Sequence, residues 1–201
     1  MELAPVTLEG RHVRLVPLTA EHVPALWDAG SDPEIWRWTL NRPGSEADMA
    51  RYVASALAKR DAGGALPFAT LEAASGRVIG STRLHNWEPP HPRVEIGYTW
   101  IARPWQRTAI NTEAKYLMLR HAFETLGVLR VELRTDALNE RSRAAILRLG
   151  ATEEGTLRRH MINDSGRVRD TVYFSILDDE WPRVKERLEE KLARPWTPIS
   201  A

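Results

Sequence analysis

Residues 101–115 read IARPWQRTAINTEAK, and this stretch carries the strongest structural signal in the chain. The end of an expected strand is followed by a turn of small and polar residues, which opens a long helix, 112–126. The first N–H groups of a helix have no partner within it and lie at the positive end of the helix dipole. The turn is therefore predicted to bind an anion. The alternative is that Thr108, with Asn111 or Thr112, only caps the helix.

The apolar periodicity predicts strands and helices on both sides of this turn. The expected strands are 12–18, 66–72, 77–85, 93–101, 128–135, 151–161 and 168–177. The expected helices are 21–30, 45–62, 112–126, 139–149 and 180–191. Short connections before residue 101 indicate an antiparallel meander, and one strand–helix–strand crossover surrounds the helix 112–126. The sequence thus predicts a mixed α/β (α+β) fold, with a ligand outside the carboxyl end of a strand at the crossover.

Length and composition favour a single domain over 1–201. A chain of 201 residues buries about 70% of its unfolded surface without cross-links. The last expected helix is followed by a short flexible tail. The chain has no cysteine, which excludes disulfides, thiolate metal sites and an enzyme thiol that carries an acyl group. We expect no metal site.

The charge balance argues against a nucleic-acid partner. The chain has 28 Lys and Arg against 27 Asp and Glu, a net charge of +1, whereas a dedicated binder concentrates a basic excess on one face. No apolar run approaches the ~18 residues of a membrane span. The first residues lack the pattern of a secretory signal. A cytoplasmic protein that binds neither nucleic acid nor membrane is expected.

Over roughly 8–192 the sequence resembles the GNAT acetyltransferase superfamily, in its branch of RimL/RimJ-type protein N-terminal acetyltransferases. The matching segments are VEIGYTWIARPWQRTAINTEAKYLMLRHAFETLG, RVELRTDALNERSRAAILRLGATEEGTLR, GRVRDTVYFSIL and EWP. The resemblance implies a central, mostly antiparallel twisted sheet of about seven strands, flanked by helices and splayed between 93–101 and 129–135. It also implies acetyl-CoA as co-substrate, and relatives suggest a homodimer.

In that family the diphosphate of acetyl-CoA rests on a loop of the pattern Gln/Arg-x-x-Gly-x-Gly/Ala. The pattern falls here on Gln106, Arg107, Thr108, Ala109, Ile110 and Asn111. Ala109 and Asn111 stand where glycine is usual, and Ala109 puts a left-handed backbone at that position in doubt. The resemblance further implies that the pantetheine arm inserts between the splayed strands, alongside Trp100, Ile101 and Ala102.

A second match lies at the start of the next helix, where Asn139-Glu140-Arg141-Ser142 has the family's Asn-x-x-Ser. The resemblance places Asn139 on the pantetheine and Ser142 near the sulfur, where its hydroxyl protonates the departing thiolate. Without the resemblance, Asn139 is an N-cap and Ser142 an ordinary first-turn residue. Direct attack of an amine on the thioester needs no enzyme nucleophile, in agreement with the absence of cysteine.

An ammonium acceptor must lose a proton before it attacks, so a base is expected near the thioester. By family position the base is Glu95, acting directly or through water. The other interpretation of Glu95 is a strand carboxylate paired with an arginine. His160 is a second candidate, because an imidazole titrates near neutral pH, although a lone histidine is more often structural.

The acceptor is expected between the segment 31–44 and the hairpin 158–170. Trp36 and Trp38 are candidate walls of its site, or else cover the core. A group of hairpin arginines either receives an acidic peptide or forms a solvated face: Arg158, Arg159, Arg167 and Arg169.

The leading hypothesis is an N-acetyltransferase that moves the acetyl group from acetyl-CoA directly to a primary amine, chiefly a protein or peptide N-terminal α-amino group. One alternative is an acetyltransferase for small-molecule amines. Another is a non-catalytic acyl-CoA-binding module, which would keep the turn at 106–111 but lack a base.

Overall fold

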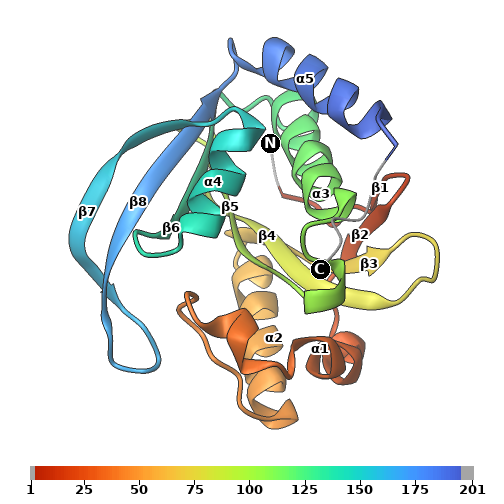
Figure 1. Ribbon diagram of the computed structural model, residues 1–201, viewed down its shortest axis with the longest axis vertical. Coiled ribbons are helices and arrows are strands. Elements are labelled where there is room, and N and C mark those ends of the chain that lie inside the picture. The colour runs from red at the N-terminus through yellow and green to blue at the C-terminus, as the bar shows by residue number, and fades with distance from the viewer. Residues whose placement is uncertain (1–2, 196–201) are drawn as a thin grey trace.

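The computed structural model describes residues 3–195, and its centre is an eight-stranded sheet in the order β1-β2-β3-β4-β5-β6-β8-β7 (Figure 1). The strands are β1 (Leu8–Glu9), β2 (Val13–Pro17), β3 (Ala65–Glu72), β4 (Val78–Glu88), β5 (Arg93–Ile101), β6 (Arg130–Asp136), β7 (Thr152–Ile162) and β8 (Val168–Leu177). Neighbouring strands are antiparallel except for β5 and β6, which run parallel. The predicted mostly antiparallel sheet is confirmed.

Helices cover both faces of this sheet (Figure 1). They are α1 (Val23–Gly30), α2 (Glu46–Asp61), α3 (Ala109–Arg120), α4 (Glu140–Leu149) and α5 (Trp181–Ala193). One apolar cluster lies under α1 and α2, with Leu26 and Met49 at its centre. A larger cluster, which includes Leu117, Ile146 and Leu188, joins α3, α4 and α5 to the other face. Burial of these apolar side chains holds the three layers together.

Three details differ from the sequence-based expectations. The sheet has one strand more than the expected seven, because β1 has two residues, too few to show alternation. Helix α3 begins at Ala109 rather than Thr112, since Thr108 is its N-cap. It ends at Arg120, where a π-helical turn, His121–Thr125, follows; a single inserted residue of this kind leaves the apolar period almost unchanged.

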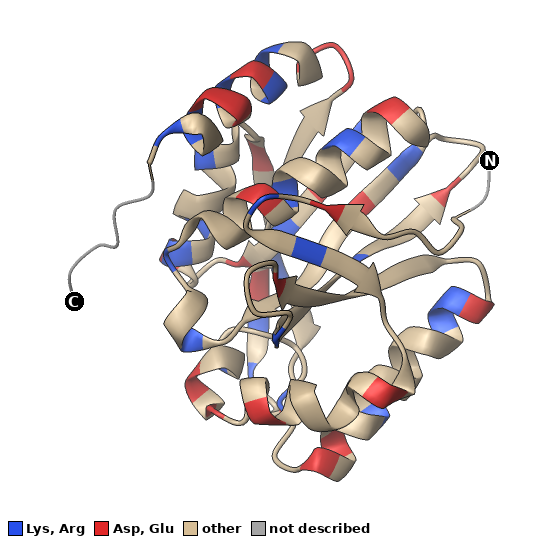
Figure 2. Cartoon of the chain, turned by 90° about the vertical axis from the view of Figure 1, so that its right-hand side faces the viewer, with Lys and Arg blue, Asp and Glu red and all other residues tan. Residues whose placement is uncertain are grey.

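The charged residues are distributed over the whole molecule. Figure 2 shows blue and red segments interleaved along the helices, and no side of the molecule in that view carries charges of one sign only. Within residues 3–195, no helix has the length and apolarity that crossing a membrane requires. Of the expected C-terminal tail, residues 196–201 lie outside the described part of the chain.

The parallel pair β5 and β6 stays together for three residue pairs only, which end at Glu95 opposite Glu132. Beyond this point β5 continues to pair with β4 but not with β6. The register between β4 and β5 shifts after Ser81, and Tyr98 has a φ of 51°. The extra residue on β5 forms a β-bulge, which increases local twist and turns the strand away from β6. The expected splay between these strands is therefore present.

One buried carboxylate joins α3 to the N-terminal part of the sheet. Glu113 is 6% exposed. Its Oε1 accepts a hydrogen bond from Arg11 N at 2.9 Å, and its Oε2 accepts from His12 N at 2.6 Å and from Val13 N at 2.9 Å. A Cβ atom on Gly10 would come within 2.5 Å of the same carboxylate. Glycine at this position therefore lets the chain pass close to the carboxylate.

Substitution of Glu113 tests this connection. Glu113→Ala is expected to lower the free energy of unfolding by about 2–4 kcal/mol, because three backbone donors lose a charged acceptor. Urea unfolding at neutral pH measures the change. Glu190→Ala removes an exposed carboxylate of α5 and is the matched control, with an expected change within about 0.5 kcal/mol. Equal losses in both variants would contradict the assignment.

Candidate functional site

The site is built where the carboxyl ends of β5 and β6 separate. Each of these parallel strands is followed by a helix, α3 after β5 and α4 after β6. Gln106 joins the two helix starts: its Nε2 donates to Ile101 O at 2.8 Å, and its Oε1 accepts from Arg141 Nη2 at 3.0 Å. Two helix N-termini therefore lie beside one opening in the sheet, which is the position where α/β folds bind ligands.

The loop 106–111 presents backbone donors at the start of α3. Thr108 Oγ1 accepts a hydrogen bond from Ile110 N at 3.3 Å and donates to Trp105 O at 2.7 Å. Within the described chain, the N–H groups of Ala109 and Asn111 have no acceptor. The left-handed residue of this loop is Arg107, with φ of 62°, whereas Ala109 is helical. Alanine at that position therefore causes no backbone strain.

The end of β5 contributes backbone rather than side chains to the opening. Trp100, Ile101 and Ala102 are between 3% and 7% exposed. Ala102 N donates to Ile79 O at 2.8 Å, so this N–H group is already paired. The edge of β5 that faces away from β4 has lost its partner strand after Glu95, and an unpaired strand edge accepts an extended ligand by backbone pairing.

Asn139 and Ser142 lie together in the first turn of α4. Asn139 is the N-cap, and its Oδ1 accepts from Ser142 N at 3.1 Å. The capping interpretation of Asn139 is thus correct. Its amide Nδ2 and the Ser142 hydroxyl have no hydrogen-bond partner among residues 3–195, and both side chains are half-buried. Capping uses one atom of Asn139 and leaves a donor available to a ligand.

Glu95 lies in a buried cluster of charged and polar groups. Its Oε1 is 2.8 Å from Arg134 Nε and 3.3 Å from His85 Nε2, and its Oε2 accepts from Asn86 Nδ2 at 2.9 Å. A Cβ atom on Gly97 would come within 2.4 Å of His85 Nε2. The glycine of VEIGY is therefore required for His85 to reach the carboxylate.

Two opposing effects set the pKa of Glu95. Burial raises the pKa, but the contacts with His85, Arg134 and Asn86 outweigh burial and hold the pKa below its ordinary value. The carboxylate is therefore ionised at neutral pH. The interpretation of Glu95 as a strand carboxylate paired with an arginine describes its contacts.

His160, on β7, lies on the same side of the sheet as this cluster. Its ring is 5.9 Å from the ring of Tyr173, whose hydroxyl accepts from Arg134 Nη1 at 3.0 Å. Burial, Arg134 and Arg169 all lower the pKa of His160. Its imidazole is therefore neutral at pH 7, and the buried Nδ1 has no partner in the described chain.

The two tryptophans of segment 31–44 have different surroundings. Trp36 is 2% exposed, packs against Trp100 and Tyr52, and donates from Nε1 to Gly30 O at 2.7 Å. It belongs to the core and offers little surface to a ligand. Trp38 is half-buried, with the guanidinium of Arg167 5.5 Å from its ring.

The segment 31–44 contacts the hairpin 158–170, as the sequence suggested. Asp164 N donates to Leu40 O at 2.9 Å, and Arg42 N donates to Asp164 Oδ2 at 3.1 Å. The four hairpin arginines, however, do not form one solvated face. Arg158 and Arg159 are exposed and Arg169 is buried, while Arg167 pairs with the buried Asp136.

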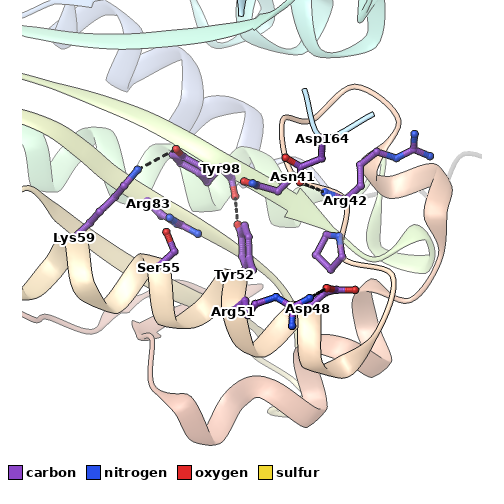
Figure 3. A pocket seen from close by; sticks show the side chains of 11 residues that line it. Asn41, Arg42, Asp48, Arg51, Tyr52, Ser55, Lys59, Arg83, Tyr98 and Asp164 are labelled. Atoms are coloured by element: carbon purple, nitrogen blue, oxygen red, sulfur yellow. Dashed lines mark hydrogen bonds and ion pairs between the residues drawn. The ribbon is translucent and has the colours of Figure 1, made fainter. Parts of the chain in front are cut away.

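A pocket of about 370 Å³ opens on the α2 face of the sheet (Figure 3). Its walls come from α2, the loop 41–43, the strands β4 and β5, and the hairpin turn: Asn41, Arg42, Pro43, Asp48, Arg51, Tyr52, Ser55, Lys59, Arg83, Tyr98 and Asp164. Arg83 and Tyr98 were not identified from the sequence. Both lie in strands with the usual alternation of side chains between the two faces of a sheet, so the surrounding sequence does not identify them as site residues.

A buried lysine lies on the opposite face. Lys115 of α3 is 6% exposed and donates to Thr99 Oγ1 at 2.5 Å. Thr99 follows the bulge residue Tyr98, in the part of β5 that has left β6. No carboxylate of residues 3–195 pairs with Lys115, and burial lowers its pKa from 10.5 to about 7. The apolar period of the expected helix 112–126 did not indicate that Lys115 is buried.

Comparison with known proteins identifies related sequences. A family model described as an acetyltransferase (GNAT) domain matches residues 12–152. YdaF of Bacillus subtilis (strain 168), to which a ribosomal N-acetyltransferase activity is ascribed, is 38% identical over 106 residues, which are 53% of this chain and 57% of YdaF. The chain spans little more than half the length of the Bacillus subtilis relatives that it matches.

Solved structures resemble the whole described fold. A GCN5-related N-acetyltransferase from Brucella melitensis is 33% identical with a TM-score of 0.89, covering 96% of this chain and 88% of that one. RimJ of Mycobacterium smegmatis, solved with CoA-disulfide, has a TM-score of 0.78 at 23% identity, covering 89% and 88% of the two chains. At that identity the second likeness concerns the fold alone.

The buried lysine generates a prediction on stability and pH. Between pH 7 and 10.5 the unfolded chain retains a proton that folded Lys115 has released, so stability rises with pH across this window. Lys115→Met should remove that rise and add about 1–4 kcal/mol to the free energy of unfolding at pH 7. Urea unfolding at pH 7 and at about pH 9.5 measures both effects. A variant with an unchanged pH slope would show that Lys115 is not the titrating group.

Proposed function

The chain belongs to the GNAT acetyltransferase family, and we propose that it transfers the acetyl group of acetyl-CoA directly to a primary amine, with a protein or peptide N-terminal α-amino group as acceptor. The observation that carries the proposal is the opening between β5 and β6, beside the starts of α3 and α4. The ribosomal N-acetyltransferase activity ascribed to YdaF supports the choice of acceptor.

The residues at the opening fit acetyl-CoA as co-substrate. The free N–H groups of Ala109 and Asn111, with the exposed guanidinium of Arg107, suit a diphosphate. The unpaired edge of β5 suits the amides of a pantetheine arm, and Asn139 Nδ2 offers it a donor. When bound, acetyl-CoA supplies a thioester carbonyl carbon that an amine attacks.

Transfer forms a C–N bond between the amine and the acetyl carbon and breaks the C–S bond. We assign to the Ser142 hydroxyl the proton that the departing thiolate receives. Ser142 lies in the first turn of α4, where the positive end of the helix dipole also favours negative charge on the sulfur. Its hydroxyl is free of other partners in the described chain.

The acceptor ammonium gives up one proton before it attacks, and we assign Glu95 as the group that takes it, directly or through water. Glu95 is ionised, as a base must be, but its lowered pKa reduces the driving force for proton transfer. His160 is the competing base, since its lowered pKa keeps it neutral at pH 7. The two assignments differ in their pH dependence.

A first experiment tests the donor and Ser142 together. Acetyl-CoA should bind at equilibrium, and free thiol should appear when N-terminal peptides are added. Ser142→Ala is expected to lower kcat by about 100-fold, because the thiolate loses its proton donor, and to leave the Kd of acetyl-CoA unchanged. Ser75→Ala, in the turn between β3 and β4, is the control.

The outcomes separate the candidate functions. Unchanged turnover in Ser142→Ala would refute its role as acid. Turnover with small amines but not with peptides would favour the small-molecule alternative. Binding of acetyl-CoA without thiol release from any acceptor would favour a non-catalytic acyl-CoA-binding module, and no binding at millimolar acetyl-CoA would overturn the proposal.

A second prediction identifies the base. If Glu95 takes the proton, kcat/KM on the acidic side falls only below pH 4.5, the ordinary value from which its pKa is lowered. If His160 takes it, kcat/KM falls below pH 6.5, the ordinary value from which the pKa of His160 is lowered, so a fall that is already present above pH 4.5 identifies His160. The pH profile of the unmodified protein decides between them, because Glu95→Gln also removes the carboxylate partner of the half-buried Arg134 and is expected to unfold more easily. His160→Gln should leave the profile intact if Glu95 is the base.

A further inference from the structure

We propose that the pocket beside Tyr98 binds a carboxylate of the acceptor, and that Arg83 is the residue that recognises it. The inference rests on the proposed function, because it assigns the α2 face of the sheet to the acceptor. It goes further in that it names the chemical class: a primary amine that carries a carboxylate a short distance from the reacting nitrogen.

The main observation is an unpaired buried cation. Arg83, on β4, is 1% exposed. Its Nε and Nη2 atoms are buried without a hydrogen-bond partner. The guanidinium lies 4.6 Å from the ring centre of Tyr52 and 4.1 Å from that of Tyr98. The rings attract the cation through their faces, but a guanidinium removed from water also needs acceptors for its donors.

Arg134, a half-buried arginine of the neighbouring Glu95 cluster, has partners for its guanidinium. Arg134 reaches Glu95 Oε1 at 2.8 Å and the Tyr173 hydroxyl at 3.0 Å. Within residues 3–195 Arg83 has no carboxylate partner and donates no hydrogen bond. The guanidinium of Arg83 is fixed by two rings, lines the pocket and lacks an acceptor for its N–H groups. A guanidinium in such a position can bind a carboxylate through two parallel hydrogen bonds.

The charges around the pocket support an anionic ligand (Figure 3). The carboxylate of Asp48 is already paired with Arg51 and Ser45, and Asp164 accepts from Arg42 N. Lys59 lies at the edge with Nζ 3.3 Å from the Tyr98 hydroxyl, and no carboxylate of the described chain pairs with it. The free charge in the pocket is therefore positive.

One wall of the pocket, Tyr98, also lies next to the cluster around Glu95. Tyr98 is the bulge residue at which β5 leaves β6, and its ring lies 5.0 Å from the ring of His85, which contacts Glu95. Arg83 and His85 are two residues apart on β4 and so point to the same face. We therefore place the carboxylate of the acceptor on Arg83 and its amine on the side of Tyr98 that faces the Glu95 cluster. A volume of about 370 Å³ suits one or two amino-acid residues.

Two kinds of acceptor contain this chemistry. A free amino acid has its carboxylate beside the amine, and a peptide has one if its second residue is acidic. Matched pairs distinguish them: serine against serinamide, and the C-terminally amidated dipeptides Ser-Glu against Ser-Gln. Thiol release from acetyl-CoA gives kcat/KM for each. The carboxylate member of at least one pair should be preferred by about 10-fold or more. Equal rates, or a preference for the amides in both pairs, would overturn the proposal.

Variants then test Arg83. Arg83→Met keeps an apolar stem between the two rings and is expected to lower kcat/KM for the preferred carboxylate by about 30-fold or more, with less than about 3-fold change for its amide partner. Arg83→Lys keeps the charge but not the fork, so part of the preference should return. Arg183→Met removes an exposed charge on α5 and should leave both rates unchanged.

A binding measurement makes the test independent of turnover and of stability. The protein saturated with CoA is titrated with the same four probes, and the carboxylate member should bind more tightly in the unmodified protein but not in Arg83→Met. If acetyl-CoA binds and amines are acetylated without any carboxylate preference, only the Arg83 inference fails. If acetyl-CoA does not bind, the proposed function fails. If Arg83→Met does not fold, the paired probes on the unmodified protein still decide.

Discussion

The site depends on how little of β5 is bonded to β6. Three residue pairs hold these parallel strands together, and the bulge at Tyr98 then turns β5 aside while its bonds to β4 continue. A sheet that remained paired to the end of β6 would close the space and would leave two helix starts with nothing between them. The geometry instead yields an open strand edge of β5 beside the starts of α3 and α4.

The two faces of this opening have different electrostatic character. On the α2 face lie Glu95 and Arg134, which pair with each other, and Arg83, which lies against the rings of Tyr52 and Tyr98. On the α3 face lies Lys115, which donates to Thr99 of β5 and whose pKa is lowered to about 7 by burial. In the proposed function, the acetyl donor and the amine acceptor therefore meet different surroundings.

Sequence patterns predicted the architecture because apolar periodicity is a local property. Short stretches of sequence were enough to predict the order of the long strands and helices and the capping of α4 by Asn139. The contacts of Glu113, Arg83 and Lys115 could not be predicted in this way. The periodic pattern of apolar residues does not indicate which charged side chains are buried. Glu113 meets its partners across about a hundred residues of chain. Trp36 illustrates the same limit, because only packing distinguishes a core indole from a wall of a site.

The contact between Asp164 and the loop at Leu40 and Arg42 has a consequence for how such a protein diversifies. The donor side is made from the ends of strands and the starts of helices, where substitutions disturb the sheet. The proposed acceptor side is bordered by two loops that contact each other through a pair of hydrogen bonds from backbone N–H groups. Loops of this kind tolerate changes in length and composition. Selectivity for a new amine can therefore arise by exchange of these two loops, at small cost to the stability of the fold.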